Sequence, residues 1–392
     1  MEFAWSKDEV AYRKELRDLV RDNQPADWWQ SYANDGPSNP KLMKFARGFA
    51  KKLAEKGHVV SHWPKAYGGR DATPWEHIIL SEEMWSEGEP RSSLYLGSNW
   101  AGPVIMMFGT EEQKALHLNN IAQGKVLWCQ GFSEPEAGSD LASLRTRAER
   151  LPEGGYLLNG RKIWTSYAHS ADWIFVLARM DSGDGGKDGG KGRGGVTVFL
   201  MPTNTPGLTF KTIRALHSAH DFHETVLDNV RVPESMRMGQ EGKGWDIVTA
   251  ALHHERIGQA HYEHSRRGLD RAVEILQERG QFDDPVVQAQ AASCVANLEA
   301  AKMLVYKVID QRARQQPPTA LTSVARVAMI RSNHMVVNFI CSFLPDVMAE
   351  GDSMDGRLQA VFKFNIASGI AAGATEVQLN LISGRYLGLP KE

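Results

Sequence analysis

The sequence predicts a mainly α-helical chain with a central β-domain. Helical apolar spacing and clear helix starts run through the first 125 residues, and helical spacing returns from Gly244 onward. Between these regions, apolar residues come in short β-type runs separated by turns. We therefore expect an N-terminal α-helical domain over residues 1–125, a small, mostly antiparallel β-domain over 126–235 and a C-terminal four-helix bundle over 236–392.

The N-terminal helices are predicted from their first residues. Capping boxes, in which a Ser or Thr precedes a Glu or Gln by three residues, begin at Ser6, Thr73 and Thr110. Asn39-Pro40 begins a further helix, whose apolar stripe continues until Gly57 ends it. These signals predict helices throughout the first 125 residues.

The two later regions are predicted from apolar period and segment length. The β-type runs are Tyr156–Asn159, Asp172–Ala178, Val196–Met201 and Glu224–Val232. Four long helical segments follow, at about 245–280, 285–314, 319–348 and 357–387, and Pro317-Pro318 separates the second from the third. Helices of such lengths favour a bundle.

Composition excludes several classes of protein. The 45 Lys and Arg residues nearly balance the 47 Asp and Glu residues, so neither a nucleic-acid surface nor an acidic tail is indicated. The three cysteines are not clustered, which argues for a reducing compartment and against a disulfide framework. The N-terminal residues do not resemble a signal peptide, and no apolar run reaches about 18 residues. We therefore expect a cytoplasmic protein without a membrane span.

A metal site is not expected. His217, His220 and His223 follow one another at intervals of three residues, and His253-His254 is a pair. No Cys or carboxylate pattern completes a zinc-binding set around them.

The stretch from Trp128 to Thr146 carries the strongest functional signal. It begins as a short apolar strand and continues as a loop with two hydroxyls, Ser133 and Ser139. A planar, hydrogen-bonding ligand would suit this loop, since its polar edge could be met without burying a charge. The alternative is a tight turn with Gly138 at a positive φ and Asp140 capping the next segment. The residues alone leave both readings open.

Four motifs in this sequence resemble those of one enzyme family. The segment 132–143, Phe-Ser-Glu-Pro-Glu-Ala-Gly-Ser-Asp-Leu-Ala-Ser, is similar to the flavin-contacting signature of the acyl-CoA dehydrogenases. Segments 160–166, 228–233 and 387–390 resemble further family motifs, in family order. The resemblance implies FAD as cofactor and an enzyme that converts an acyl-CoA thioester to the trans-2-enoyl form.

The resemblance also implies which residues surround the flavin and the substrate. Ser133 and Ser166 would hydrogen-bond the flavin edge, and Trp164 would cover one ring face, although Trp164 could instead belong to the core of the β-domain. The matched positions in the first two motifs are Gln130, Phe132, Ser133, Ser139, Trp164 and Ser166, with Ser139 on the substrate side.

Two positions in the C-terminal half match family contacts to the FAD of a neighbouring subunit. Arg279 matches the arginine at the FAD pyrophosphate, and Gln290 matches a second contact; an arginine at a helix end is more often simply solvated. The segment Leu344–Met348 departs from the family's Gln-x-x-Gly-Gly pattern, which puts one contact to the adenine end in doubt. The resemblance thus implies a homo-oligomer, a dimer or tetramer, or a heteromer with a homologous subunit.

The catalytic base is predicted at Glu255. One branch of the family places its Glu near the C-terminus, where Ala372 stands here, and another places it before an arginine, as in Glu255-Arg256. Arg256 should point toward the flavin or the CoA, since adjacent helix residues face about 100° apart. The alternative is an ordinary pair of adjacent charges on a helix.

The chemistry of dehydrogenation requires a base, hydrogen-bond donors and a cofactor, as the resemblance implies. A base must remove the α-proton, hydrogen bonds must stabilise the enolate-like oxygen, and a cofactor must accept the hydride. The resemblance implies that electrons pass to an electron-transfer flavoprotein. A flavin monooxygenase or nitroalkane-oxidase-like enzyme of the same fold, or a non-catalytic subunit of a heteromer, is the alternative.

Overall fold

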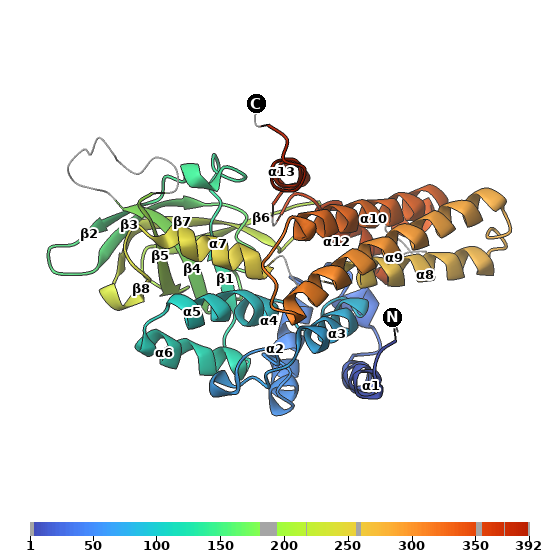
Figure 1. The fold of residues 1–392 in the computed structure, drawn as a ribbon, viewed down its shortest axis with the longest axis horizontal. Helices are drawn as coiled ribbons and strands as arrows, with labels where there is room; N and C mark the ends of the chain where they lie inside the picture. Colours follow the sequence, from blue (N-terminus) through green and yellow to red (C-terminus); the bar gives the residue numbers. More distant parts are fainter. Residues whose placement is uncertain are drawn as a thin grey trace. The chain divides into compact units, whose positions relative to one another are not determined.

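The computed structural model describes residues 4–180, 194–216, 218–255, 260–349, 355–371 and 373–390; the side chains of residues 252–255 lie outside the description. The chain divides into two compact units, and neither is continuous in sequence. The first unit comprises Met1–Leu42, Ala72–Pro90 and Arg256–Glu392, and the second comprises Met43–Asp71 and Arg91–Glu255. Figure 1 labels the helices and strands.

Helices make up most of the first unit and a smaller part of the second, and the predicted mainly α-helical class is confirmed. They are α1 (Lys7–Arg21), α2 (Pro40–Glu55), α3 (Pro74–Ser86), α4 (Leu94–Leu96), α5 (Gly102–Phe108), α6 (Glu111–Ala122), α7 (Gly244–Glu255), α8 (His261–Glu278), α9 (Pro285–Ala313), α10 (Leu321–Phe343), α11 (Pro345–Met348), α12 (Gly356–Ile366) and α13 (Thr375–Leu381). Short π-helices are η1 (Trp28–Tyr32), η3 (Gly97–Ala101) and η6 (Ile382–Tyr386), and short 3-10 helices are η2 (Lys65–Tyr67), η4 (Leu141–Ser143) and η5 (Glu234–Met236).

The second unit contains one eight-stranded sheet. Its strands are β1 (Trp128–Gly131), β2 (Arg147–Arg150), β3 (Tyr156–Lys162), β4 (Trp173–Met180), β5 (Val196–Pro202), β6 (Leu208–Ile213), β7 (Phe222–Val232) and β8 (Arg237–Met238). Their order is β6-β7-β3-β2-β4-β5-β8, with β1 beside β4. Only the β1–β4 and β2–β4 pairings among these strands are parallel, so the predicted, mostly antiparallel sheet is confirmed.

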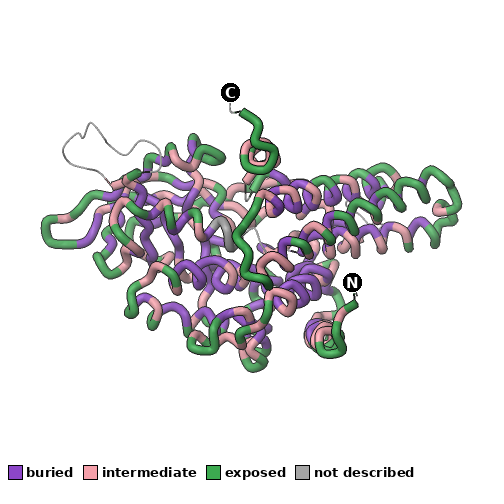
Figure 2. Tube along the Cα trace, viewed as in Figure 1, coloured by how far each residue is buried: buried purple, intermediate pink, exposed green. Residues whose placement is uncertain are grey.

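The sheet core is built on β4 and β5. Most residues of these two strands are buried, five of eight in β4 and six of seven in β5, and Figure 2 draws buried positions in purple. Helix α7 packs on β5 and also contacts η3 and α5 (Figure 1). A strand buried on both faces needs a continuous apolar run, and the segment Val198–Met201 supplies one.

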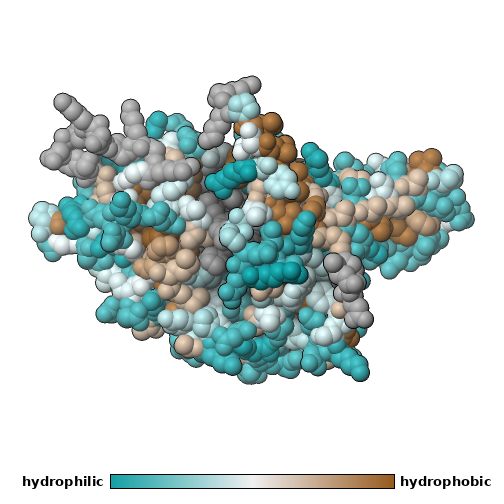
Figure 3. All heavy atoms as spheres, viewed as in Figure 1, coloured by the Kyte–Doolittle hydropathy of each residue, from teal (hydrophilic) through white to brown (hydrophobic). Residues whose placement is uncertain are grey.

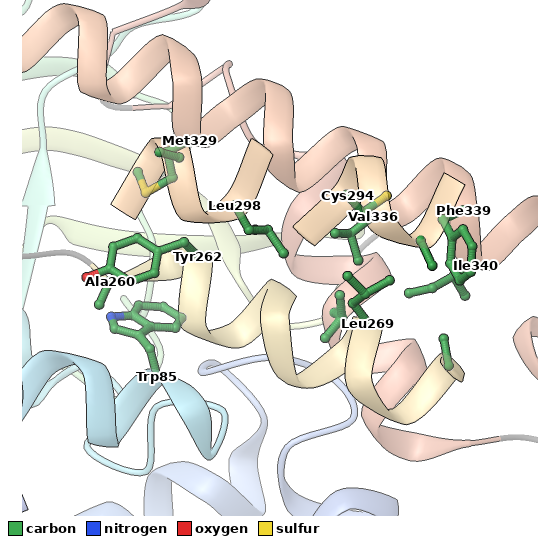
Figure 4. Close-up of a cluster of buried hydrophobic side chains, with 14 of the residues drawn as sticks. Trp85, Ala260, Tyr262, Leu269, Cys294, Leu298, Met329, Val336, Phe339 and Ile340 are labelled. Atoms are coloured by element: carbon green, nitrogen blue, oxygen red, sulfur yellow. The ribbon is translucent and has the colours of Figure 1, made fainter. Parts of the chain in front are cut away.

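The first unit is organised around four helices of the C-terminal half. Helices α8, α9, α10 and α12 pack against one another, and α3 joins them through α8 and α9. Figure 4 shows Trp85 and Tyr262 at one end of the shared core and Phe339 and Ile340 toward the other. The predicted helical C-terminal region is thus confirmed.

Three of the four helical segments predicted for this region are divided in the structure. The segment 319–348 becomes α10, which ends at Phe343, and α11, which begins at Pro345. The segment 245–280 becomes α7, which ends at Glu255 and belongs to the second unit, and α8, which begins at His261 in the first unit. The segment 357–387 is divided after α12, where Gly369 and Gly373 both adopt a φ of 90° that no helix contains. The spacing of apolar residues shows that a segment is helical, but it does not show which of the two cores the helix packs against.

A buried histidine in the second unit should make the free energy of unfolding depend on pH. His117 of α6 is 1% exposed and lies edge-on to Trp128 and Trp173, with ring centroids 5.1 and 4.5 Å away. Burial lowers the pKa of His117 to about 4. In the unfolded chain a histidine protonates near pH 6.5, so the unfolded state binds more protons than the folded state between these values.

We therefore expect the free energy of unfolding to fall as the pH drops from about 6.5 to about 4. The slope assigned to His117 is at most about 1.4 kcal/mol per pH unit. Urea denaturation at several pH values would measure it, and His117→Leu should flatten the dependence in this window. An equally steep dependence in His117→Leu would show that other groups cause it.

Candidate active site

Two segments predicted to contact a flavin lie side by side in the second unit. The loop after β1 and the segment after β3 are joined where Ile163 N donates a hydrogen bond to the Ser133 carbonyl oxygen at 2.9 Å. This bond brings Ser133 next to the segment that carries Trp164 and Ser166. The parallel pairing of β1 with β4, which runs from Trp128↔Trp173 to Gly131↔Val176, fixes where the loop begins.

The segment Trp164–Tyr167 is held in an unusual backbone conformation. Trp164 and Tyr167 have φ values of 60° and 63°, which bulky residues rarely adopt. Backbone hydrogen bonds impose them: Thr165 and His223 exchange two bonds of 3.0 and 3.1 Å, and Tyr167 N donates to Asp221 O at 3.1 Å. Strained backbone of this kind persists where the surrounding structure enforces it, and it clusters at functional sites.

Trp164 is not a core residue. Its side chain is 51% exposed and meets Phe222 edge-on at 5.4 Å between ring centroids. An indole ring that could be buried but is held half exposed on a strained backbone offers a flat apolar surface to a ligand. This geometry favours the flavin interpretation over the core alternative.

Several polar atoms near the two segments have no partner among the residues that the structure describes. The hydroxyls of Ser133 and Ser166 are half buried and make no hydrogen bond within the described part of the chain. The side-chain oxygen of Gln130 and the indole nitrogen of Trp100 are buried and have no partner among the described residues. Buried polar atoms are normally paired, so this group of donors and acceptors fits a polar, planar ligand such as the edge of a flavin.

Aromatic side chains form the apolar side of the same region. Phe132 is buried and packs against Trp100 and Phe175, with ring centroids 5.1 and 5.6 Å away. Phe132 therefore anchors the loop to the sheet by its ring. Ser139, six residues beyond Ser133, is exposed and lies on the outer part of the loop.

The predicted base belongs to the same unit as these segments. Glu255 is the last residue of α7, and α7 packs on η3, which carries Trp100. The side chain of Glu255 and the whole of Arg256 lie outside the described residues, as does Ala372. Their predicted roles stay predictions.

The two residues predicted to serve a neighbouring subunit lie in the first unit. Gln290 is exposed on α9. Arg279, which caps α8, forms a two-pronged ion pair with Asp346 of α11, with bonds of 2.9 and 2.7 Å. Asp346 lies in the segment where the sequence departs from the family pattern, and nothing in the sequence predicted that it would pair with Arg279.

The histidine-rich segment forms no metal cluster in the described part of the chain. His223 is buried and stacks on His169 at 5.1 Å, while His217 and the side chains of His253 and His254 lie outside the description. No group of three His, Cys, Asp or Glu side chains suited to a metal ion is found among the described residues. Within those residues, no helix combines the length and apolar character needed to cross a membrane.

Comparison with known proteins identifies similar sequences over the whole chain. The N-terminal, middle and C-terminal domains of acyl-CoA dehydrogenase match residues 6–125, 129–230 and 242–387. Acyl-CoA dehydrogenase IpdE1 of Mycobacterium tuberculosis is 30% identical, over 98% of this chain and 99% of that protein. Acyl-CoA dehydrogenase FadE34 of the same organism is 34% identical over 86% of this chain, which spans only 46% of that longer protein.

Solved structures agree with the sequence comparison. The structure titled "Tcur3481-Tcur3483 steroid ACAD" matches with a TM-score of 0.91 and 27% identity over all of both chains. The ChsE4-ChsE5 complex from Mycobacterium tuberculosis matches with a TM-score of 0.88 and 27% identity, also over all of both chains. Three domains in family order and a full-length relative show that the chain belongs to the acyl-CoA dehydrogenase family, whose members are oxidoreductases acting on CH-CH donors.

Proposed function

We propose that the protein is an FAD-dependent acyl-CoA dehydrogenase that removes the α-proton and β-hydride of a CoA thioester and yields the trans-2-enoyl-CoA. The cofactor is FAD, as predicted, and when bound it supplies the hydride acceptor that no side chain provides. The observation that carries the proposal is the hydrogen bond between Ile163 and Ser133, which joins Ser133 to the segment carrying the half-exposed Trp164 indole; the Ser133 and Ser166 hydroxyls have no partner among the described residues.

Each residue of the set has a role in this reaction. Ser133 and Ser166 donate hydrogen bonds to the flavin edge, and Trp164 covers one face of the ring. Gln130 offers a further polar contact from the end of β1, and Phe132 fixes the loop by packing on Trp100.

The remaining roles belong to the substrate side. Glu255 accepts the α-proton, which needs a carboxylate held rigidly by a helix. Ser139 and Arg256 bind the CoA thioester. The side chains of Glu255 and Arg256 lie outside the described residues, so these two roles rest on the family match alone.

The proposal predicts a yellow protein with about one FAD per chain and activity on acyl-CoA. We expect an artificial electron acceptor to be reduced when an acyl-CoA is added, and we propose a bulky polycyclic acyl group, because one full-length structural match is titled a steroid enzyme. A panel of short, long, aromatic and steroid thioesters measures this. Turnover restricted to straight chains would contradict the choice of acyl group, and no turnover with any thioester would contradict the proposed function.

The electron acceptor distinguishes the main alternative. We propose an electron-transfer flavoprotein, on the family resemblance. A flavin monooxygenase or nitroalkane-oxidase-like enzyme would instead consume oxygen during turnover. Oxygen uptake equal to product formation, with no transfer to an electron-transfer flavoprotein, would favour that alternative.

We further propose that the chain works in an oligomer, through the outer face of α9. The exposed residues of this helix from Val286 to Asn297 include no charged side chain, and Figure 3 shows apolar side chains gathered along the bundle helices. Interface cores are depleted in charge in this way. Two matched structures carry titles that name pairs of proteins, which supports a heteromer with a homologous subunit.

Adding a charge on this face should weaken assembly. We expect Ala292→Arg, at an exposed position, to shift the protein to a smaller species in light scattering after size exclusion, since an arginine would have to be buried unpaired. Gln123→Arg, at an exposed position in the second unit, is the control and should leave the mass unchanged. An unchanged mass in Ala292→Arg would exclude this face. If the chain alone lacks flavin and gains it only with a partner, it is one subunit of a heteromer.

A further inference from the structure

A buried ion pair joins the two segments assigned to the flavin. Lys162, the last residue of β3, is fully buried, and its Nζ lies 2.7 Å from Glu134 Oε1 and 3.2 Å from the Phe132 carbonyl oxygen. Glu134 directly follows Ser133, and Lys162 stands two residues before Trp164. The pair therefore links the same two segments as the Ile163–Ser133 backbone bond, through side chains.

Glu134 also closes the loop that it begins. Its Oε2 accepts a hydrogen bond from Arg145 N at 2.6 Å, and its Oε1 accepts one from Thr146 N at 2.8 Å. The carboxylate thus binds amides eleven and twelve positions further along the chain, so both ends of the loop around Ser139 are fixed by one side chain. All of these atoms lie within the second unit.

Arg179 of β4 holds the later part of the same loop. Its guanidinium donates to the carbonyl oxygens of Ala142 and Leu144, with bonds of 2.7 and 3.1 Å. Its backbone N–H donates to Thr146 O at 2.7 Å. The loop is thereby tied to the sheet at its beginning by Lys162 and at its end by Arg179.

The charges of the pair stabilise each other in an interior that disfavours them singly. Burial lowers the pKa of Lys162 to about 8, against the opposing effect of the Glu134 carboxylate. Burial acts to raise the pKa of Glu134, but the Lys162 ammonium and the bonds from residues 145 and 146 outweigh it and hold that pKa below its usual value. Both groups are thus mainly charged at neutral pH.

Stability alone does not account for such a pair. Apolar residues of similar volume often replace a buried ion pair with no loss of stability, whereas removing one partner leaves an uncompensated charge. The pair instead fixes how the two segments are oriented, because each of its hydrogen bonds constrains an angle as well as a distance.

We propose that Glu134 and Lys162 are positioning residues for the flavin, which hold the Ser133 hydroxyl and the Trp164–Ser166 segment at one fixed separation. The inference rests on the assignment of these two segments to the flavin under the proposed function. The pair would act through Ser133, Trp164 and Ser166 and would not itself touch the substrate.

The test replaces both charges together. The double variant Glu134→Gln/Lys162→Met removes the ion pair without leaving a lone buried charge. The matched control is Glu153→Gln/Arg231→Met, which removes an exposed ion pair of the same unit. In each full-length protein, in its native assembly, we would measure the FAD dissociation constant, the visible flavin spectrum, thermal unfolding and amide hydrogen exchange at residues 145 and 146.

We expect the double variant to fold, to bind FAD about 10- to 100-fold more weakly, as when outer-shell partners of metal ligands are removed, and to exchange amides 145 and 146 faster. The control should match the wild type in all four measurements. Wild-type FAD affinity and spectrum in a folded double variant would overturn the proposal.

A second variant decides the case in which the double variant does not fold. Glu134→Asp keeps the charge but shortens the arm by one methylene, so it should weaken FAD binding with little change in thermal unfolding. Unchanged FAD affinity in Glu134→Asp would overturn the proposal. All of these measurements omit acyl-CoA, so a failure of the proposed dehydrogenation would be recognised separately, by the thioester panel.

Discussion

Glu255→Gln is expected to lower the turnover of acyl-CoA by roughly 10²–10⁴-fold while FAD content stays unchanged. The amide keeps the size of the side chain and can hydrogen-bond, but it cannot accept the α-proton. Glu255 ends α7, a helix that packs within the same unit as the loop after β1. Flavin reduction by substrate under anaerobic conditions measures the chemical step directly, without the electron acceptor.

Glu376→Gln is the matched control for this experiment. Glu376 lies in the first turn of α13 and is exposed, four residues beyond the position at which another branch of the family carries its base. We expect it to reduce flavin at the wild-type rate. Normal reduction in Glu255→Gln together with none in Glu376→Gln would move the base to the C-terminal helix.

The largest expected loss of stability follows from Glu82→Ala. The Glu82 carboxylate of α3 is 1% exposed and accepts hydrogen bonds from Tyr262 and Tyr306, both at 2.7 Å, and from Arg13 at 2.5 Å. Lys302 Nζ lies 3.8 Å away. Burial and the Glu82 charge raise the pKa of both phenols, so these hydroxyls stay protonated and act as donors.

Without the Glu82 carboxylate, the buried Tyr262 hydroxyl and the half-buried Tyr306 hydroxyl lose this acceptor, and of the two Arg13 ion pairs only the one with Glu83 remains. Removing one partner of a buried ion pair typically costs 3–5 kcal/mol, and we expect a loss of about this size in urea denaturation. Glu153→Gln, which breaks an exposed pair with Arg231, should cost far less, because water screens that pair. A loss no larger than that of the control would show that the cluster contributes little.

Local signals in the sequence predicted local structure well. Each of the capping boxes expected at Ser6, Thr73 and Thr110 is present with both of its hydrogen bonds, since the groups involved are only three residues apart. The four β-type runs were predicted from the spacing of apolar residues, which is also a signal between neighbours in the sequence. The family resemblance supplied the site residues, which spacing and composition could not.

Features that depend on distant contacts escaped prediction. Lysine side chains are seldom fully buried, yet Lys162 is, and its ammonium group is paired with the carboxylate of Glu134, 28 positions away. Asp346 pairs with Arg279 across 67 positions. Neither partner carries a local mark of the pairing, so only the folded chain shows which charges meet.

The discontinuity of the two units has a consequence for synthesis of the chain. The first unit needs α1 and α3 at its beginning and α8 and α9 near its end, and Glu82 reaches its partners Tyr262 and Tyr306 across 180 and 224 positions. The second unit is complete once Glu255 has left the ribosome, whereas α1 and α3 must wait for the C-terminal helices. During that interval the apolar residues of α3 lack the faces of α8 and α9 that bury them, so we expect the first unit to fold only after the C-terminal helices have been made.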